Sequence, residues 1–210
     1  NKKDFYYIDR PYWGESRATP YWMRCVKNQH VKTFVDHRPD DRFKQQFKDE
    51  IKPFHKNGKY VLVVPPSHAM AEMFGGQDWL DNTMRTLKEN TDRELVVREK
   101  PYNPEAVIDS GGKMLPGKSA NNQPPKPFEW DKVHAVVTFN SSISIKALTN
   151  GVPAFANFDN PCMPVCEQDF SKIETPRYED PRPVFNSLAY GQFTQKEFRS
   201  GYYMEMIDGR

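Results

Sequence analysis

The sequence predicts an α/β protein with a Rossmann-like, doubly wound parallel sheet, together with an aromatic, largely irregular N-terminal segment and C-terminal helices. The first observation is that short runs that are apolar on both faces occur at 59–64 and 133–139, and such runs are typical of parallel strands covered by helices. The second is the order of the predicted elements. They alternate as strand, helix, strand, loop, strand, helix, strand, which indicates a sheet with crossover connections.

Residues 1–57 are aromatic and basic and show no strand or helix period before Asp40. From that point Phe43, Phe47 and Ile51 fall at i, i+4 and i+8, which predicts a short amphipathic helix. We expect this stretch to form a separate N-terminal segment ahead of the sheet.

The first half of the sheet is predicted from two apolar runs and the helix between them. The run at 59–64 lies between an Asn-Gly turn signal and a Pro-Pro pair, which fixes both of its ends. A second strand is expected at 94–98. Over 78–90 the apolar residues share one stripe of a helix, with charges opposite, and they are Leu80, Met84 and Leu87.

The second half of the sheet begins after a long polar stretch. Residues 109–129 are low in apolar content and rich in Gly, Pro, Asn and Lys, which predicts a mobile loop that could act as a lid. The third strand is expected at 133–139 and the fourth at 152–155, with a short helix between them. We therefore place the Rossmann-like domain at 58–189.

The last residues, 190–210, are predicted to form a C-terminal helix. Thr194 and Glu197 stand at the spacing of a capping box. Phe198, Tyr202 and Met206 then continue an apolar stripe at i, i+4 and i+8. We expect this stripe to pack on the sheet.

Composition limits the classes of function. The chain has 210 residues, 37% hydrophobic content, 13% aromatic content and 18 prolines, and its mean hydropathy is −0.83. Its net charge of +2 gives no general signature of binding to polyanions. Three cysteines without CxxC spacing and five scattered histidines argue against a disulfide framework and a protein-bound metal, and favour a reducing cytoplasm. No apolar run approaches the ~20 residues of a membrane-spanning helix.

Three polar segments follow predicted strands and should meet at the carboxyl edge of the sheet, where such sheets bind ligands. Ser141 and Ser142, with the backbone N–H groups of a helix start, are candidates to hold a phosphate. The alternative is that they only cap the helix. Arg98 and Lys100 are candidates to neutralise phosphates, or form a solvated cluster with Glu99. The remaining candidates at this edge are Ser67 and Asn140.

Two carboxylates are candidates for a general base. Asp9 lies among Tyr6, Tyr7, Tyr12 and Trp13, and this aromatic setting is expected to desolvate it and raise its pKa. The alternative is a local ion pair between Asp9 and Arg10. Asp36 is the second candidate, with a structural role as its alternative. His134 falls within an apolar strand and is expected to be a core histidine.

The stretch from Phe139-Asn140-Ser141-Ser142 to Gly151-Val152-Pro153 resembles the donor-binding motif of GT-B glycosyltransferases, in which a polar turn and a helix ending in Gly-x-Pro hold a nucleotide diphosphate. The wider sequence is similar to bacterial and phage glycosyltransferase-like proteins that are related to enzymes of capsule and lipopolysaccharide synthesis. The resemblance covers most of 59–207 as the second, donor-binding domain. Residues 4–13 resemble a segment near the end of the first domain, so 1–57 would be its remnant or its end.

The resemblance implies transfer of a sugar from a nucleotide-sugar donor to a hydroxyl acceptor, either a surface saccharide or a hydroxymethylated DNA base of a phage. A Mg²⁺ ion carried by the donor diphosphate is compatible with this reaction. The chain is too short for two Rossmann domains, so we expect a preceding domain, a partner or a second copy to complete the cleft. Stacking and phosphate contacts to DNA would come from the N-terminal segment, through Arg17, Tyr21, Trp22, Arg24, Lys27 and Lys32.

One residue departs from the family's pattern. GT-B enzymes commonly place a Glu four residues after the last turn Ser, where it holds the donor ribose, and this chain has Lys146 there. An ammonium cannot accept a hydrogen bond from a ribose hydroxyl, although it can pair with a phosphate. The alternative function is therefore a non-catalytic binding or assembly module that keeps half of a GT-B fold.

Overall fold

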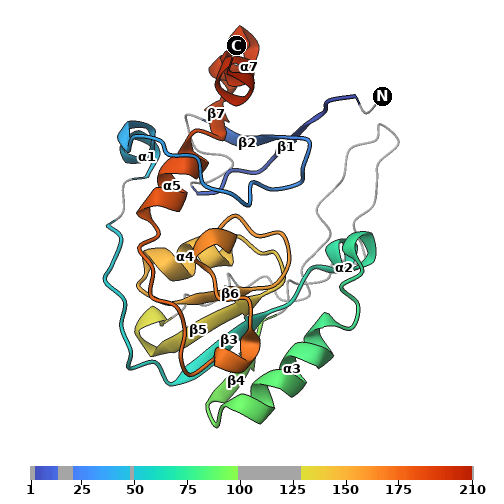
Figure 1. Cartoon of the computed structure of the whole chain (residues 1–210), viewed down its shortest axis with the longest axis vertical. Coiled ribbons are helices and arrows are strands. Elements are labelled where there is room, and N and C mark those ends of the chain that lie inside the picture. The colour runs from blue at the N-terminus through green and yellow to red at the C-terminus, as the bar shows by residue number, and fades with distance from the viewer. Residues whose placement is uncertain (1–2, 14–20, 48–49, 99–128, 210) are drawn as a thin grey trace, which may run out of the picture.

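Two β-sheets organise the chain, and the larger one is the parallel sheet that the sequence predicts. The computed structural model describes residues 3–13, 21–47, 50–98 and 129–209. Figure 1 shows the larger sheet in the lower half of the molecule and the smaller sheet above it. The smaller sheet is built from residues near both ends of the chain.

Four strands form the larger sheet in the order β4-β3-β5-β6, and all neighbouring pairs are parallel. The strands predicted for this sheet are confirmed, with ends that shift by one or two residues. β5 is buried along its whole length, which explains its nearly continuous apolar sequence. The bounds are β3 (Tyr60–Val64), β4 (Glu94–Val97), β5 (Val133–Thr138) and β6 (Ala154–Ala156).

Helices cover both faces of the parallel sheet. α2 (His68–Phe74) and α3 (Trp79–Asn90) lead from β3 to β4, and α4 (Ile143–Thr149) leads from β5 to β6. Val61 of β3 shares a buried core with Leu87 of α3. Because successive side chains of a strand point to opposite faces, the next residue, Leu62, lies in the other core, with Leu148 of α4. The sheet is therefore covered on both sides, and Figure 1 shows α3 and α4 on opposite sides of it.

The chain returns from α4 to β6 through a turn that requires glycine. Gly151 has a φ of +72°, and a Cβ at this position would lie 2.1 Å from the carbonyl oxygen of Pro53. The N–H of Lys52 donates to the carbonyl of Thr149 at 2.9 Å, and the N–H of His55 donates to the carbonyl of Gly151 at 3.0 Å. The Gly-Val-Pro sequence thus holds the segment 52–55 against the end of α4.

The smaller sheet corrects the expectation of a largely irregular N-terminal segment. β1 (Tyr6–Asp9) and β2 (Trp22–Lys27) pair antiparallel, and β7 (Gln192–Thr194) pairs with the other edge of β2. The N-terminal segment and the C-terminal residues therefore share one sheet. The sequence shows no sign of these strands because both of their faces are partly covered. Aromatic and charged residues therefore occupy both faces, and no alternation of apolar and polar residues results.

Two further helices pack against each other through aromatic side chains. α1 (Asp41–Gln46) corresponds to the helix predicted from Asp40, but it ends at Gln46, so the predicted i+8 residue Ile51 is outside it. α5 (Arg182–Ala189) was not predicted. Phe43 of α1 and Phe185 of α5 face each other with ring centroids 5.7 Å apart.

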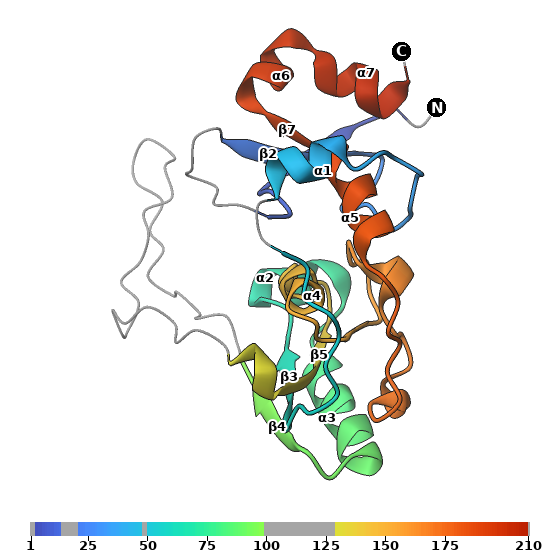
Figure 2. The same cartoon turned by 90° about the vertical axis from the view of Figure 1, so that its left-hand side faces the viewer.

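The C-terminal helix is confirmed in its start but not in its length or its packing. The capping box is present, since the N–H of Glu197 donates to Thr194 Oγ1 at 3.2 Å and the N–H of Thr194 donates to Glu197 Oε2 at 2.7 Å. Gly201, with a φ of +80°, then divides the helix into α6 (Gln195–Ser200) and α7 (Tyr202–Asp208). The expected packing on the parallel sheet is wrong. Both helices lie over the smaller sheet, on its far side from the parallel sheet (Figure 2).

Short 3₁₀ turns complete the fold at η1 (Trp130–Lys132), η2 (Met163–Val165) and η3 (Phe170–Lys172). Within the described residues, no helix has the length and apolar character needed to cross a membrane.

Candidate functional site

The three predicted ligand-facing segments leave neighbouring parallel strands at the same edge of the sheet. β3 pairs with β4 up to Val63 and Val97, and with β5 up to Val64 and Thr138. Arg98 directly follows β4, and its N–H still donates to the carbonyl of Val63 at 2.8 Å. The predicted convergence of Ser67, Arg98 and the Asn140 turn on one edge therefore holds, whereas Lys100 and loop residues 109–128 lie outside the described residues.

The Ser-Ser turn is anchored to both central strands. The hydroxyl of Thr138 donates to the carbonyl of Val64 at 2.8 Å and accepts from the N–H of Ser141 at 3.3 Å. The N–H of Ile143 donates to Ser141 Oγ at 3.3 Å. Two N–H groups that the sequence suggested for a phosphate are therefore used inside the turn. Ser141 partly fulfils the capping alternative, while within the described residues the exposed Ser142 makes no side-chain capping bond.

A buried amide that sequence reasoning missed ties this turn to the loop after β6. Asn160 is fully buried, and its Nδ2 donates to the carbonyl of Ser141 at 3.1 Å. Its Oδ1 accepts from the hydroxyl of Ser144 at 2.8 Å and from the N–H of Cys162 at 2.9 Å. These bonds fix the turn before any ligand binds. The sequence offered no signal for Asn160 beyond its place in a polar turn.

Lys146 is exposed on α4, one helical turn beyond Ser142. Its neighbours Ile145 and Ala147 are buried, so the lysine occupies the outward side of the helix. The structure thus presents an ammonium group where the GT-B pattern has a carboxylate.

Asp9 forms an ion pair, and its pKa is shifted in the direction opposite to the one expected. Its Oδ2 lies 2.8 Å from Arg24 Nη2, and its Oδ1 accepts from the N–H of Arg10 at 2.7 Å. Partial burial alone would raise the pKa of Asp9, but the Arg10 N–H and the Arg24 guanidinium together lower it. A carboxylate held in this way is a weaker base than its aromatic surroundings suggested. Its charged partner is Arg24 rather than the side chain of Arg10.

Asp36 has the structural role that was its alternative. It is paired with Lys32 and with Arg38 Nε, the latter at 2.7 Å, and it accepts from the hydroxyl of Ser187 on α5. Burial opposes ionisation, but the bonds from Lys32, Ser187 and Arg38 hold the pKa of Asp36 far below its usual value. This carboxylate fastens the segment after β2 to α5.

His134 is a core histidine, as expected. Its Nε2 lies 2.8 Å from the carbonyl of Ile173, and the side chain is buried. Burial lowers the pKa of His134.

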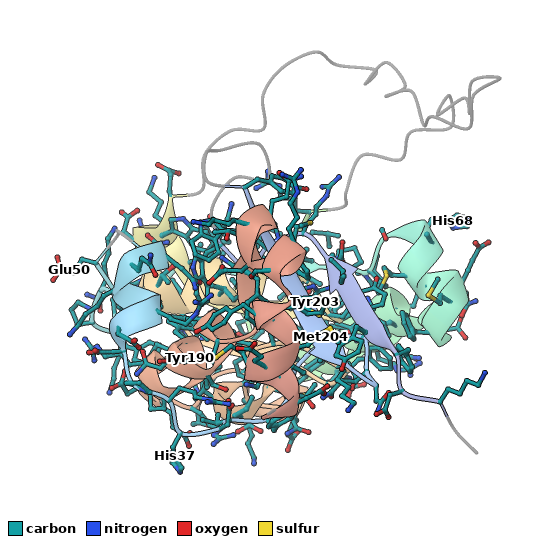
Figure 3. All side chains as sticks on the ribbon, turned by 90° about the horizontal axis from the view of Figure 1, so that it is seen from above. His37, Glu50, His68, Tyr190, Tyr203 and Met204 are labelled. Atoms are coloured by element: carbon teal, nitrogen blue, oxygen red, sulfur yellow. The ribbon has the colours of Figure 1, made fainter. Side chains whose placement is uncertain are left out.

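A chain of aromatic rings connects the smaller sheet with the carboxyl edge of the larger one. His30 lies between Tyr7 and Phe74, at centroid distances of 4.6 and 5.2 Å. Phe74 ends α2 and lies 5.3 Å from Phe158, which stacks at 4.3 Å on Phe139, the residue before Asn140. Figure 3 looks down on the smaller sheet and shows α2, marked by His68, at its side. His30 was missed because β2 and the turn that follows it were not predicted.

Three cations proposed for DNA contacts are engaged within the protein. Arg24 pairs with Asp9, and Lys32 pairs with Asp36. Lys27 Nζ lies 2.8 Å from Asp4 and 2.9 Å from Asp208. Arg17 lies outside the described residues.

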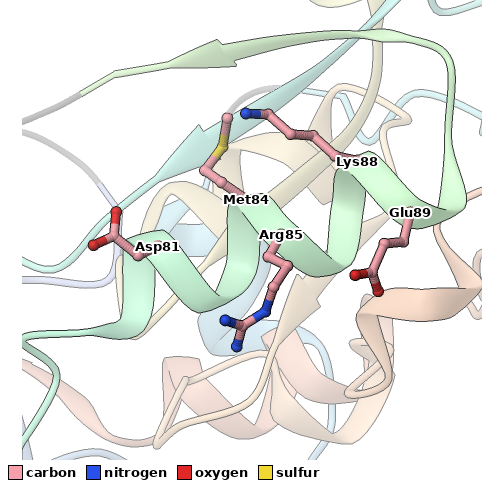
Figure 4. Close-up of a pocket in the computed structure, with 5 residues that line it drawn as sticks. All are labelled: Asp81, Met84, Arg85, Lys88 and Glu89. Atoms are coloured by element: carbon pink, nitrogen blue, oxygen red, sulfur yellow. The ribbon is translucent and has the colours of Figure 1, made fainter.

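Two surface hollows lined by described residues lie apart from this edge. One, of about 430 Å³, follows the flank of α3 (Figure 4) and is lined by Asp81, Met84, Arg85, Lys88 and Glu89. The other surrounds Thr91–Glu94 at the start of β4, where Arg93 is held by Glu174 at 2.9 Å and by the carbonyl of Gly58. Because parallel sheets bind ligands at the carboxyl ends of their strands, we do not include these hollows in the site.

Among the described residues, no group of three or more His, Cys, Asp or Glu side chains is placed to hold a metal ion. Comparison of the sequence with protein-family models and with curated proteins finds no match.

Proposed function

We propose that this chain binds a nucleotide sugar at the carboxyl edge of its parallel sheet and acts as the donor-binding half of a GT-B-type glycosyltransferase. The observation that carries the proposal is the convergence of Ser67, Arg98 and the Ser-Ser turn on three neighbouring parallel strands. This is the place where doubly wound sheets bind nucleotides.

The electrostatics of the edge suit a diphosphate leaving group. Arg98 supplies a guanidinium that can bind phosphate oxygens in a bidentate manner. Ser142 presents an exposed hydroxyl on a turn that Thr138 and Asn160 hold in place. A preorganised turn stabilises developing charge without having to reorganise during the reaction. Lys146, which cannot hold the ribose, would add a second cation.

Thermal stability with added nucleotide sugars tests the proposal. UDP-, CMP- and GDP-sugars should be titrated with and without Mg²⁺. A ligand at about 100 times its Kd stabilises the fold by about 2.7 kcal/mol, which is a measurable rise in Tm. If none of these donors raises the Tm, the proposed function is refuted.

Two arginine variants locate the site. We expect Arg98→Ala to abolish the rise in Tm because it removes the cation at the end of β4. Arg85→Ala is the matched control, since Arg85 is exposed on α3 and bonds to Asn82. An unchanged rise in Arg98→Ala, or an equal loss in both variants, would contradict the placement of the diphosphate.

The non-catalytic binding module remains the second candidate, and Lys146 together with the ion-paired Asp9 is what favours it. A module of this kind would bind donors without cleaving them. Release of the nucleotide from the stabilising donor (UDP, GDP or CMP), followed over time, separates the two candidates.

The acceptor and the location are part of the same proposal. Because Arg24, Lys27 and Lys32 are engaged in ion pairs, a saccharide acceptor is favoured over DNA. A partner domain or a second copy would complete the cleft above the edge. The buried, unbridged thiols of Cys25, Cys162 and Cys166 support a reducing compartment such as the cytoplasm.

A further inference from the structure

The outermost strand of the parallel sheet, β4, has a lateral edge that carries apolar residues. Among the described residues β4 has one neighbouring strand, β3. The central strand β5 is buried along its whole length, whereas no residue of β4 is buried and Val97 is 38% exposed. The lateral edge of such a strand presents a row of N–H and C=O groups that serves as a template for another strand.

The backbone groups on this lateral edge belong to Leu95 and Val97. The N–H of Arg98 donates to the carbonyl of Val63 on β3 at 2.8 Å. Backbone groups of successive residues in a strand point to alternate sides, so those of Val97 and Leu95 point away from β3. An added strand would therefore form its hydrogen bonds with these two residues.

The charges that flank β4 fit a second copy of the same strand, paired antiparallel. When the pairing is centred on Val96, Leu95 lies opposite Val97 of the second copy. Glu94 then lies opposite Arg98 of the second copy, and the twofold axis repeats both contacts. Opposite charges directly across an antiparallel pair are stabilising. Moving the centre by one residue in either direction would place one of these charges opposite Val96 instead, so the charges select this register.

The helix that precedes β4 turns an exposed flank toward the same lateral edge. Trp79 of α3 lies 6.0 Å from Phe170 of η3, which contacts Phe155 of β6, so this flank of α3 faces the β6 side of the sheet. At 3.6 residues per turn, Asp81 and Lys88 project from the opposite flank, and both are exposed. They line part of the hollow of about 430 Å³ in Figure 4, which therefore lies on the β4 side of the helix.

A second copy would bring its own α3 against this flank. Because the twofold axis is perpendicular to the sheet, both helices lie on one face and run antiparallel. Asp81 of each copy can then pair with Lys88 of the other, with the half-buried Met84 between the two pairs. A stable interface buries about 1,200–2,000 Å² in total, which is more than two short strands supply, and the helices provide the remainder.

We propose that the chain forms a symmetric dimer in which the two β4 strands pair antiparallel and the two α3 helices pack side by side. The two parallel sheets, with four strands from each copy, then form one continuous sheet. This interface does not depend on the proposed function. Arg98 belongs to both, and because its guanidinium carries five N–H donors, an ion pair with Glu94 of the second copy is compatible with phosphate binding.

The mass of the protein in solution is the first test. Size-exclusion chromatography with light scattering should give twice the 24.5 kDa of the chain. A chain that stays monomeric up to its solubility limit would overturn the proposal.

Val97→Pro locates the interface. Proline removes an N–H that points away from β3 and is tolerated in edge strands, so the fold should stay while the Kd of the dimer rises by about tenfold or more. Ile8→Pro is the matched control, because Ile8 is 46% exposed on β1, an edge strand of the smaller sheet. The N–H of Asn28 donates to the carbonyl of Phe5, so the N–H of Ile8 also points outward. Equal Kd values in the two variants, or a larger change in Ile8→Pro, would exclude β4 as the interface.

Charge reversal tests the register. Glu94→Arg and Arg98→Glu each place like charges opposite each other at both ends of the strand pair, so each variant alone should be monomeric. Circular dichroism confirms that each variant is folded. When the two are mixed, opposite charges meet again at both ends, and a heterodimer should form. A mixture that stays monomeric would refute the pairing. None of these measurements uses a nucleotide, so a failure of the dimer is distinguished from a failure of the proposed function.

Discussion

At the scale of single residues, the candidate site depends on polar side chains that satisfy the hydrogen-bonding groups of their neighbours. Asn160 is the clearest case, since one buried amide serves the carbonyl of Ser141, the hydroxyl of Ser144 and the N–H of Cys162. Its role is to fix the position of the turn, so Ser142 is presented in a defined place. Asp36 and His30 differ in how fully their polar atoms are bonded. The bonds of Asp36 hold the fold together, whereas His30 Nδ1 has no partner among the described residues.

Asn160→Ala should destabilise the fold by about 3 kcal/mol, because it leaves several buried polar groups unpaired at about 1–3 kcal/mol each. Chemical denaturation measures the change. Asn82→Ala, at an exposed position on α3, should stay within about 0.5 kcal/mol of the parent chain. Equal effects of the two substitutions would mean that the Asn160 network does not support the turn.

At the scale of elements, the difference between predicted and missed strands has a physical origin. β3 and β5 were predictable because helices cover both of their faces and all their residues except the half-buried Tyr60 are buried, which leaves an apolar run in the sequence. β1 and β2 face α7 on one side and His30 and Phe74 on the other, so tyrosines and charged residues are interspersed with apolar residues on both faces. Their partner β7 lies more than 160 residues further along the chain, and no local pattern reveals such a pairing.

The residues of the candidate site also divide into predictable ones and missed ones. Ser67, Arg98 and the Ser-Ser turn were predictable, since parallel strands bring their carboxyl ends to one edge whatever the details of packing. His30 and Asn160 were not predictable. The contacts of His30 join the smaller sheet to α2, and those of Asn160 join the loop after β6 to the Ser-Ser turn.

One buried carboxylate attaches α7 to the smaller sheet. The Asp208 side chain is 1% exposed and accepts from Tyr6 Oη and Lys27 Nζ. A hydrogen bond to a charged group contributes about 1.5–3 kcal/mol, so Asp208→Ala should speed amide hydrogen exchange in Tyr202–Asp208 by about tenfold or more. Glu205→Ala, at an exposed position on the same helix, should leave exchange unchanged. Equal exchange in both variants would show that α7 is held by its apolar contacts instead.

At the scale of the whole molecule, ion pairs join segments that are distant in the sequence, and this makes stability depend on pH. Asp36, Glu174 and Glu197 are paired with Lys32, Arg93 and Arg42 respectively. In each case burial opposes ionisation, but the cationic partner and nearby hydroxyl or N–H donors lower the pKa of the carboxyl below its ordinary value.

A carboxyl whose pKa is lower in the folded chain stabilises the fold above its unfolded pKa, about 3.9 for Asp and 4.3 for Glu. That contribution is lost as the pH falls through the folded pKa. We therefore expect the free energy of unfolding to decrease steadily below about pH 5. Asp36→Asn should flatten this decrease, whereas Asp92→Asn, at an exposed position, should not. Denaturant titrations between pH 3 and 7 measure both slopes, and parallel curves would exclude Asp36 as a source.

The pairing of β2 with β7 also has a consequence for the order in which the chain assembles during synthesis. All four parallel strands are complete once residue 156 has left the ribosome, whereas the smaller sheet must wait for residue 194. Contacts between such distant residues form late because their loop-closure entropy is large. The first strands to be made are thus the last to be completed. The smaller sheet of this protein therefore matures only after its parallel sheet.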